Sequence, residues 1–272
     1  MRWHAALAPL AAALLAAAPS AQQILAAAVG PVARADGGQV TVAVDDLTTG
    51  TEAAYGGTRE FVTASIVKVD ILCTLLYRSQ RSHRALSSEE KELATTMIEN
   101  SDNDSASSLY GDAGGAAGVD EANRVFGLRE TTAGAGPYWG LTMTSAADQV
   151  RLLRLVFTRP SVLTVTSQDY VQRLMGHVET DQQWGVPAAA DHGTPFMVKN
   201  GWLPSPDTGR WEINSIGEVV HDHQRMLIAV LSDDNASEAS GISVVEKVAA
   251  KAADAISRVS RLAARVPAGP AA

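Results

Sequence analysis

Residues 61–72, FVTASIVKVDIL, constrain the fold most, because they place a lysine inside an otherwise apolar run. The apolar positions recur at helical spacing, which predicts a helix that begins near residues 63–65. A lysine is rarely buried without a partner, and fixing its side chain costs about 2 kcal/mol of rotamer entropy. Lys68 therefore calls for a specific role. Ser65 precedes it by one helical turn and lies on the same face of the helix.

Composition restricts the classes of partner. The chain has 272 residues, of which 46% are hydrophobic and 19% charged, as in a globular protein with a large core. Its net charge is -8, and it has no basic block. This argues against nucleic acid and anionic membrane surfaces as partners, but not against a small anionic substrate. We expect a monomer that binds a small molecule.

The N-terminus resembles a secretion signal. An arginine is followed by an alanine- and leucine-rich run, and the run is too short to span a bilayer comfortably. We predict a signal peptide over residues 1–21, and hence a secreted or extracytoplasmic protein without stable membrane insertion. The alternative is an alanine-rich helix that belongs to the fold. At the other end, residues 263–272 are expected to be disordered.

The order of elements predicts the architecture. A short helix and a hairpin of alternating valines come first, a helical block follows, and three strand-like runs precede a final amphipathic helix. This order favours an α/β protein of the α+β kind. It predicts one antiparallel five-stranded sheet flanked by N- and C-terminal helices, with an inserted all-helical lobe. Within a domain over residues 22–262, the sheet part covers about 22–62 and 194–262, the lobe covers about 63–193, and the active site lies between them.

The Ser-x-x-Lys spacing suggests a nucleophile and its base. A serine hydroxyl needs a base to take its proton, and a lysine in a desolvated, cationic pocket has a lowered pKa and can serve as that base. The same spacing recurs at Ser88–Lys91, but there it begins a polar helix, where capping and solvent exposure explain it. The apolar surroundings favour Ser65–Lys68.

Two further motifs could join this pair. Ser101-Asp102-Asn103 falls at a break between two helices, where a short loop can direct a hydroxyl and an amide at one point. On its own it is equally typical of an ordinary turn. Lys199-Asn200-Gly201 lies on a predicted strand and would supply a cation next to a backbone that a ligand can approach closely. The three motifs together, in this order, carry more weight than any one of them.

This set resembles the S-x-x-K, S-D-N and K-T-G motifs of class A β-lactamases and their penicillin-binding relatives. The resemblance covers roughly residues 38–257. It implies that Ser65 is the acylated nucleophile, and that Lys68 takes its proton or holds the hydrogen-bond network. It also implies that Ser101 relays a proton to the leaving nitrogen, while Asn103 holds Lys68 and the substrate amide.

The resemblance assigns the substrate-binding groups as well. Lys199 and Arg210 would bind the substrate carboxylate, beside Asn200 and Gly201. The N–H groups of Ser65 and Trp202 would form the oxyanion hole. No cofactor or metal is implied. The stretch HDH at residues 221–223 is better explained by a strand turn than by a metal site.

The sequence departs from the family at two places. Asn200 stands where the family has threonine or serine, which bears on substrate choice. The glycine- and proline-rich segment 128–144 has Glu130 as its only carboxylate and no asparagine, whereas hydrolases of the family use a glutamate there to activate the deacylating water. We expect Glu130 to be a surface residue. Either an acyl-enzyme persists, or Lys68 serves both steps.

Four functions stay open on these grounds. The first is hydrolysis of a β-lactam or a related cyclic or linear amide through an acyl-enzyme. The second is a penicillin-binding D,D-peptidase that acts on peptidoglycan stem peptides. The third is a binding or sensor protein that is acylated and turns over slowly, and the fourth is a scaffold without chemistry. The intact motif residues argue against the last. The aromatic residues of PYWG, 137–140, would either form a wall of the cleft or pack in the core.

Overall fold

The computed structural model describes residues 19–35 and 39–264. Most of the predicted signal peptide and of the predicted tail lies outside these residues. The elements, in chain order, are α1 (Ala21–Ala35), β1 (Gln39–Asp46), β2 (Thr51–Tyr55), β3 (Phe61–Val62), η1 (Ala64–Ile66), α2 (Val67–Arg81), α3 (Ser88–Glu99), α4 (Asn103–Asp112), α5 (Gly115–Phe126), η2 (Trp139–Leu141), β4 (Met143–Thr144), α6 (Ala146–Phe157), α7 (Val165–Met175), η3 (Thr180–Gln182), η4 (Val186–Ala189), β5 (Met197–Pro204), β6 (Trp211–His221), β7 (Gln224–Asn235) and α8 (Glu238–Ala264).

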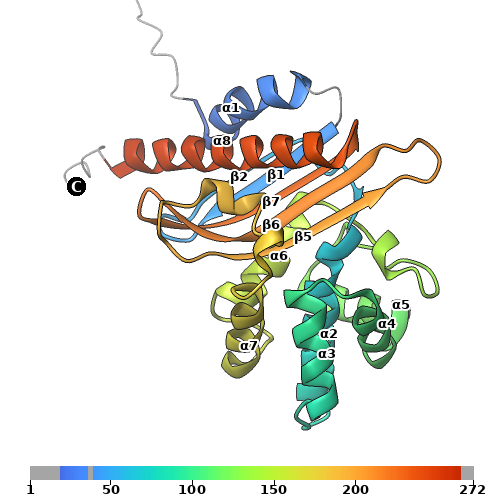
Figure 1. Cartoon of the computed structure of the whole chain (residues 1–272). Helices are drawn as coiled ribbons and strands as arrows, with labels where there is room; N and C mark the ends of the chain where they lie inside the picture. The colour runs from blue at the N-terminus through green and yellow to red at the C-terminus, as the bar shows by residue number, and fades with distance from the viewer. Residues whose placement is uncertain (1–18, 36–38, 265–272) are drawn as a thin grey trace, which may run out of the picture.

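The main sheet has five antiparallel strands in the order β2-β1-β7-β6-β5. The first hairpin and the last three strands therefore meet in the middle, where β1 pairs with β7. This confirms the predicted five-stranded antiparallel sheet and its two separate sequence segments. Strand β5 lies at the edge of the sheet, next to the helical lobe (Figure 1).

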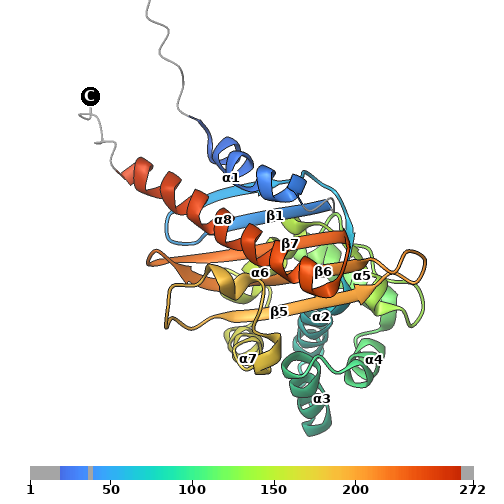
Figure 2. The same ribbon diagram turned by 45° about the horizontal axis from the view of Figure 1, so that its top comes forward.

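Helices cover both faces of the sheet. Helices α1 and α8 lie across one face, and α8 runs along it diagonally (Figure 2). Alternate residues of β7 explain this arrangement: Ile228 and Val230 are buried on the α8 side, whereas Leu227 and Ala229 are buried with the opposite core. Helix α1 begins with a capping box, in which Ser20 and Gln23 bond each other reciprocally.

The opposite face carries α6 and the all-helical lobe. Helix α2 runs through the middle of the lobe, in contact with α3, α4, α5 and α7, so that apolar residues are buried around most of its circumference. Cys73 is among them and is completely buried, as expected for a small hydrophobic residue. The inserted lobe predicted from the sequence is thus present, with α2 as its core.

A small second sheet was not anticipated. Phe61–Val62 pairs with Met143–Thr144, although the two segments are about 80 residues apart in the chain. The pairing brings segment 128–144 beside the residues that precede α2. Among the described residues, no helix is both long enough and apolar enough to cross a bilayer.

Candidate active site

Ser65 lies where the chain enters the helical lobe. It belongs to the short turn η1, directly before α2, and its side chain is partly exposed. Ala64, the residue before it, has a positive φ of 47°. A non-glycine residue in this region is strained, and such strain is common at functional sites. The serine is therefore presented on a tight turn at the N-terminal end of a helical segment.

The turn is held by segment 128–144. The Thr63 N–H donates to the Thr142 carbonyl at 2.8 Å, and the Thr63 hydroxyl donates to the Gly140 carbonyl at 3.4 Å. Asn214, on β6, donates its side-chain amide to the carbonyls of Val62 and Thr63 at 2.8 and 3.1 Å. The backbone before Ser65 is thus fixed from both sides.

Lys68 has the hydrogen-bond partners that a buried amine needs. Its Nζ is 2.5 Å from the Ser101 carbonyl, 2.8 Å from Asn103 Oδ1 and 3.2 Å from Ser101 Oγ. Its side chain is completely buried. Burial lowers the pKa of Lys68 from 10.5 to about 7, and the charge of nearby Asp102 opposes this shift. A neutral amine is therefore accessible near neutral pH.

Lys199 reaches the same hydroxyl from the other side. Its Nζ donates to Ser101 Oγ at 2.9 Å and to the Asn200 carbonyl at 3.1 Å. Burial, assisted by the charge on Lys68, holds the pKa of Lys199 well below its usual value. Ser101 itself has a positive φ of 56°. The first, second and third motifs therefore meet at one serine hydroxyl, which lies between two buried amines.

Asp102 caps the helix that follows. Its carboxylate accepts from the Ser105 N–H at 2.7 Å at the start of α4, and hydrogen bonding from the side chain and the N–H of Ser105 lowers the pKa of Asp102. Lys68 and Lys199 form no ion pair with a carboxylate among residues 19–35 and 39–264. Both Nζ atoms therefore have neutral hydrogen-bond partners, which agrees with the lowered pKa of each lysine.

Gly201 brings β5 against the turn that carries Ser65. A Cβ on this glycine would lie 2.8 Å from the Ser65 nitrogen and 2.7 Å from the Thr63 carbonyl oxygen. Only a residue without a side chain fits this approach. The free edge of β5, with Trp202 as the next residue, therefore runs beside the Ser65 N–H. The oxyanion role of the Trp202 N–H stays a prediction.

Asn200 is turned away from this cleft. Its side-chain amide donates to the carbonyls of Gln182 and Trp184 at 2.8 and 3.0 Å, and its exposed fraction is 1%. Successive residues of a strand point to opposite sides, so Asn200 faces the opposite way from Lys199. In this structure Asn200 holds the loop at 182–184. The sequence had suggested instead that its side chain contacts the substrate.

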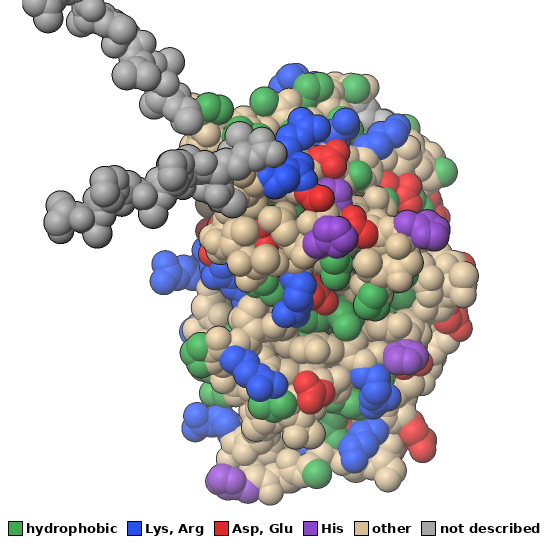
Figure 3. Space-filling model, turned by 90° about the vertical axis from the view of Figure 1, so that its left-hand side faces the viewer, with side chains coloured by type: hydrophobic (Ala, Val, Ile, Leu, Met, Phe, Trp, Pro, Cys, Tyr) green, Lys and Arg blue, Asp and Glu red, His purple; other side chains and the backbone are tan. Residues whose placement is uncertain are grey.

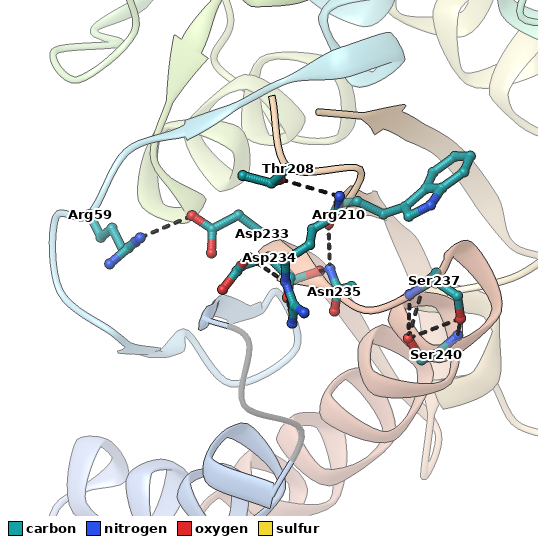
Figure 4. A network of polar contacts seen from close by, with 10 residues as sticks. Arg59, Thr208, Arg210, Asp233, Asp234, Asn235, Ser237 and Ser240 are labelled. Carbon is teal, nitrogen blue, oxygen red and sulfur yellow. Dashed lines mark hydrogen bonds and ion pairs between the residues drawn. The ribbon is translucent and has the colours of Figure 1, made fainter. Parts of the chain in front are cut away.

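Arg210 is also engaged elsewhere. Its guanidinium donates to the Asp234 carbonyl at 2.8 Å and forms an ion pair with the Asp234 carboxylate (Figure 4). Asp234 belongs to β7, on the far side of β6 from β5. The structure therefore does not bring Arg210 to the Lys199 cluster, and we leave it out of the proposed site.

Segment 128–144 presents an aromatic ring. Trp139 lies over Lys68, with the amine 4.9 Å from the ring centroid, and its Nε1 donates to Ser107 Oγ at 3.1 Å. Glu130, the carboxylate of this segment, accepts from the Ser145 hydroxyl at 2.7 Å and lies 3.8 Å from Arg151. It is half-buried, not the exposed residue that we expected.

Sequence reasoning missed Asn214 and left the role of Trp139 open. Asn214 is a buried polar residue in a largely apolar strand. This unusual placement is the sequence feature that could have identified it. No comparable signal marked Trp139. Among the described residues, no three His, Cys, Asp or Glu side chains gather as metal ligands. His221 bonds the Ala189 carbonyl and faces Asp254.

Solved structures with this fold are class A β-lactamases and related proteins. A class A β-lactamase from Bacteroides cellulosilyticus has a TM-score of 0.76 at 18% identity, covering 89% of this chain and 100% of that one. A β-lactamase from Chitinophaga pinensis also scores 0.76, at 19% identity, covering 85% and 98%. A PBP-A mutant, solved as an acyl-enzyme with penicillin G, scores 0.75 at 19% identity, covering 89% and 100%.

A curated relative and a family model match the sequence itself. LppW of Mycobacterium tuberculosis, named as a predicted lipoprotein, is 29% identical over 177 residues, which cover 63% of this chain and 56% of that protein. The match thus spans little more than half of the relative's length. The model of the beta-lactamase enzyme family matches residues 21–91 and 87–262. The chain belongs to the beta-lactamase enzyme family, a family of serine hydrolases.

Proposed function

We propose that this protein forms an acyl-enzyme on Ser65 with β-lactams or peptide-like amides and releases the product slowly. The observation that carries this proposal is a hydrogen-bond network in which Lys68 and Lys199 both bond the Ser101 hydroxyl. Lys68 itself lies one helical turn from Ser65. A nucleophile, a base with a lowered pKa and a proton relay are the groups that amide acylation needs.

The chemistry can be assigned group by group. Neutral Lys68 accepts the proton of Ser65 as Oγ attacks the amide carbonyl. The N–H groups of Ser65 and Trp202 bind the resulting oxyanion. As the carbon–nitrogen bond breaks, the Ser101 hydroxyl gives its proton to the leaving nitrogen and receives one from the adjacent lysine ammonium. Water then adds to the ester and releases Ser65.

The substrate class follows from charge. The two buried amines lie beside a serine that is partly exposed, so a substrate carboxylate that reaches Ser101 would favour the protonated form of Lys199. Charged side chains of both signs are interspersed on the face shown in Figure 3. Capture of a substrate carboxylate is local, so the net charge of -8 does not argue against a small anionic substrate. No cofactor is needed for these steps.

Slow release is favoured over rapid hydrolysis because no carboxylate of the described residues bonds Lys68. Among the described residues, Asp102 caps α4 and Glu130 is held by Ser145 and Arg151. Neither lies in contact with Lys68. A penicillin-binding type of reaction, with a D,D-dipeptide stem or a β-lactam as acyl donor, fits this arrangement better than efficient β-lactam hydrolysis. The lipoprotein name of LppW supports an extracytoplasmic location.

Intact mass after incubation with a penicillin tests the proposal, followed over time beside a chromogenic β-lactam assay. We expect one adduct per chain with the mass of the ring-opened penicillin, and a slow return to the free protein. Rapid steady turnover would overturn slow release while supporting the acyl-enzyme chemistry. The lack of any adduct or turnover, with penicillins and with a D-Ala-D-Ala peptide ester, would overturn the proposal.

A further inference from the structure

On the side of segment 128–144 that faces Lys68, the contact is made by the Trp139 ring. The indole lies over the Lys68 amine at 4.9 Å and is half-buried. Its Nε1 bonds Ser107 on α4, the helix that follows the Ser101 motif. The ring therefore spans from α4 to α2 and covers Lys68 on the side that faces the loop.

The loop holds this ring in one place. Thr132 and Met143 exchange two backbone hydrogen bonds at its base, each 3.0 Å. Inside the loop, the Thr142 hydroxyl donates to the Trp139 carbonyl at 2.7 Å and accepts from the Gly134 N–H at 3.0 Å. A Cβ on Gly134 would lie 2.0 Å from the Tyr138 carbonyl oxygen, so the loop is folded tightly on itself.

The covered side of Lys68 lacks a group that could activate water. An indole has no basic nitrogen and accepts no proton from a water molecule. The groups that do face Lys68 are Ser101 and Asn103 from the start of α4, with the charges of Asp102 and Lys199 nearby. All of them lie at the start of α4 or on β5, and the loop contributes only the ring.

We propose that Trp139 is a positioning residue that sets the lifetime of the acyl-enzyme, because its ring excludes a hydrolytic water from the loop side of Lys68. The proposal rests on acylation of Ser65. It makes the aromatic ring the reason why the ester persists. The same cation–π contact, favourable by electrostatic attraction, keeps the lysine directed at Ser101 and Asn103.

The ring also contributes to the burial that lowers the Lys68 pKa. Truncating it hydrates the amine, which raises the pKa, whereas loss of the cation–π contact acts in the opposite direction. Burial is the largest cause of the shift in the wild type. We therefore expect the midpoint of the pH profile of acylation to move upward when Trp139 is truncated.

Adduct lifetime in Trp139 variants tests the proposal. After labelling with a penicillin and removal of excess reagent, intact mass gives the half-life of the adduct. For Trp139→Ala we expect a half-life shorter by about 100-fold, at the lower end of what general-base catalysis supplies. The pH midpoint of acylation should rise by about one unit. Trp139→Phe keeps a ring over Lys68 and should retain a lifetime close to that of the wild type.

Matched variants separate this effect from loss of structure. Glu130→Gln changes the loop carboxylate, which does not contact Lys68, and should leave the adduct lifetime unchanged. If Trp139→Ala does not fold, Trp139→Leu keeps an apolar side chain, and its lifetime should lie between those of the Ala and Phe variants.

The outcomes are distinct. An adduct on the wild type whose lifetime and pH midpoint are the same in a folded Trp139→Ala or Trp139→Leu variant would overturn the role of Trp139 and leave the proposed function intact. A clearly longer lifetime in Glu130→Gln would also overturn it, because the loop carboxylate would then be the base that activates the water. No adduct on the wild type would overturn both proposals.

Discussion

The two Ser-x-x-Lys segments have the same spacing and opposite surroundings. Lys68 is completely buried and bonds Ser101 and Asn103, whereas Ser88 and Lys91 are exposed at the start of α3. There the capping residue is Ser87, whose hydroxyl and backbone N–H exchange bonds with Glu90. Spacing thus places two side chains on one helical face, but it is burial away from water that lowers the pKa of the lysine there.

Loss of the nucleophile is the largest effect expected. Ser65→Ala should abolish penicillin labelling, because the neighbouring Thr63 hydroxyl is buried and donates to the Gly140 carbonyl. Ser88→Ala should label like the wild type. Intact mass after incubation measures both. Equal loss in the two variants would mean that the chemistry belongs to the other segment or to neither.

The lysines should differ almost as much. Lys68→Met removes the base and should slow acylation by about 10²- to 10⁴-fold, the usual contribution of general-base catalysis. Lys91→Met changes an exposed side chain on another helix and should have no effect. Stopped-flow or quenched mass measurements of the labelling rate make the comparison. A Lys68→Met variant that acylates at the wild-type rate would remove the lysine from the mechanism.

The rate of acylation should depend on pH in the direction set by Lys68. Its pKa is lowered to about 7, and only the neutral amine accepts a proton. Below pH 7 the neutral fraction falls about tenfold for each unit, so the rate rises with pH and levels off above about pH 7 to 8. Labelling rates from pH 5 to 9 check this. A rate that falls across this range would contradict a neutral-lysine base.

The smallest effect separates stability from chemistry. Ser87→Ala removes the capping box of α3 and should lower the free energy of unfolding by about 1 kcal/mol. Ser88→Ala, at the next position, should leave stability nearly unchanged. Chemical denaturation compares the two. The labelling rate should stay at the wild-type value in both, and a change in rate for Ser87→Ala would connect α3 to the site.

The architecture followed from local patterns to a large extent. The alternating valines of β1 have the hydrophobic period of a strand, and the apolar residues of α2 and α8 have that of a helix. Once the elements are known, their order along the chain allows only a few topologies. The pairing of Phe61–Val62 with Met143–Thr144 could not be predicted in this way, because two-residue strands carry no periodic signal. That pairing nevertheless positions segment 128–144.

The sequence pointed to candidate site residues where a charged side chain interrupts an apolar run. Lys68 and Lys199 are charged residues in apolar runs, and both proved to be buried and to share one hydroxyl partner. The direction of Asn200 and the partner of Arg210 depend on neighbouring loops and strands, so the motif alone did not determine them. Sequence suggested both as substrate contacts, and their side chains have other partners.

By itself the sequence determined a helical segment that begins near Ser65, the lysine one turn later and the two further motifs, because periodicity and burial cost are local properties. Tertiary structure decided which groups those residues contact. It brought Ser101 between two amines, set Gly201 against the turn that carries Ser65 and laid Trp139 over Lys68. These contacts join residues from distant parts of the chain, and their chemistry depends on how much water the packed elements exclude.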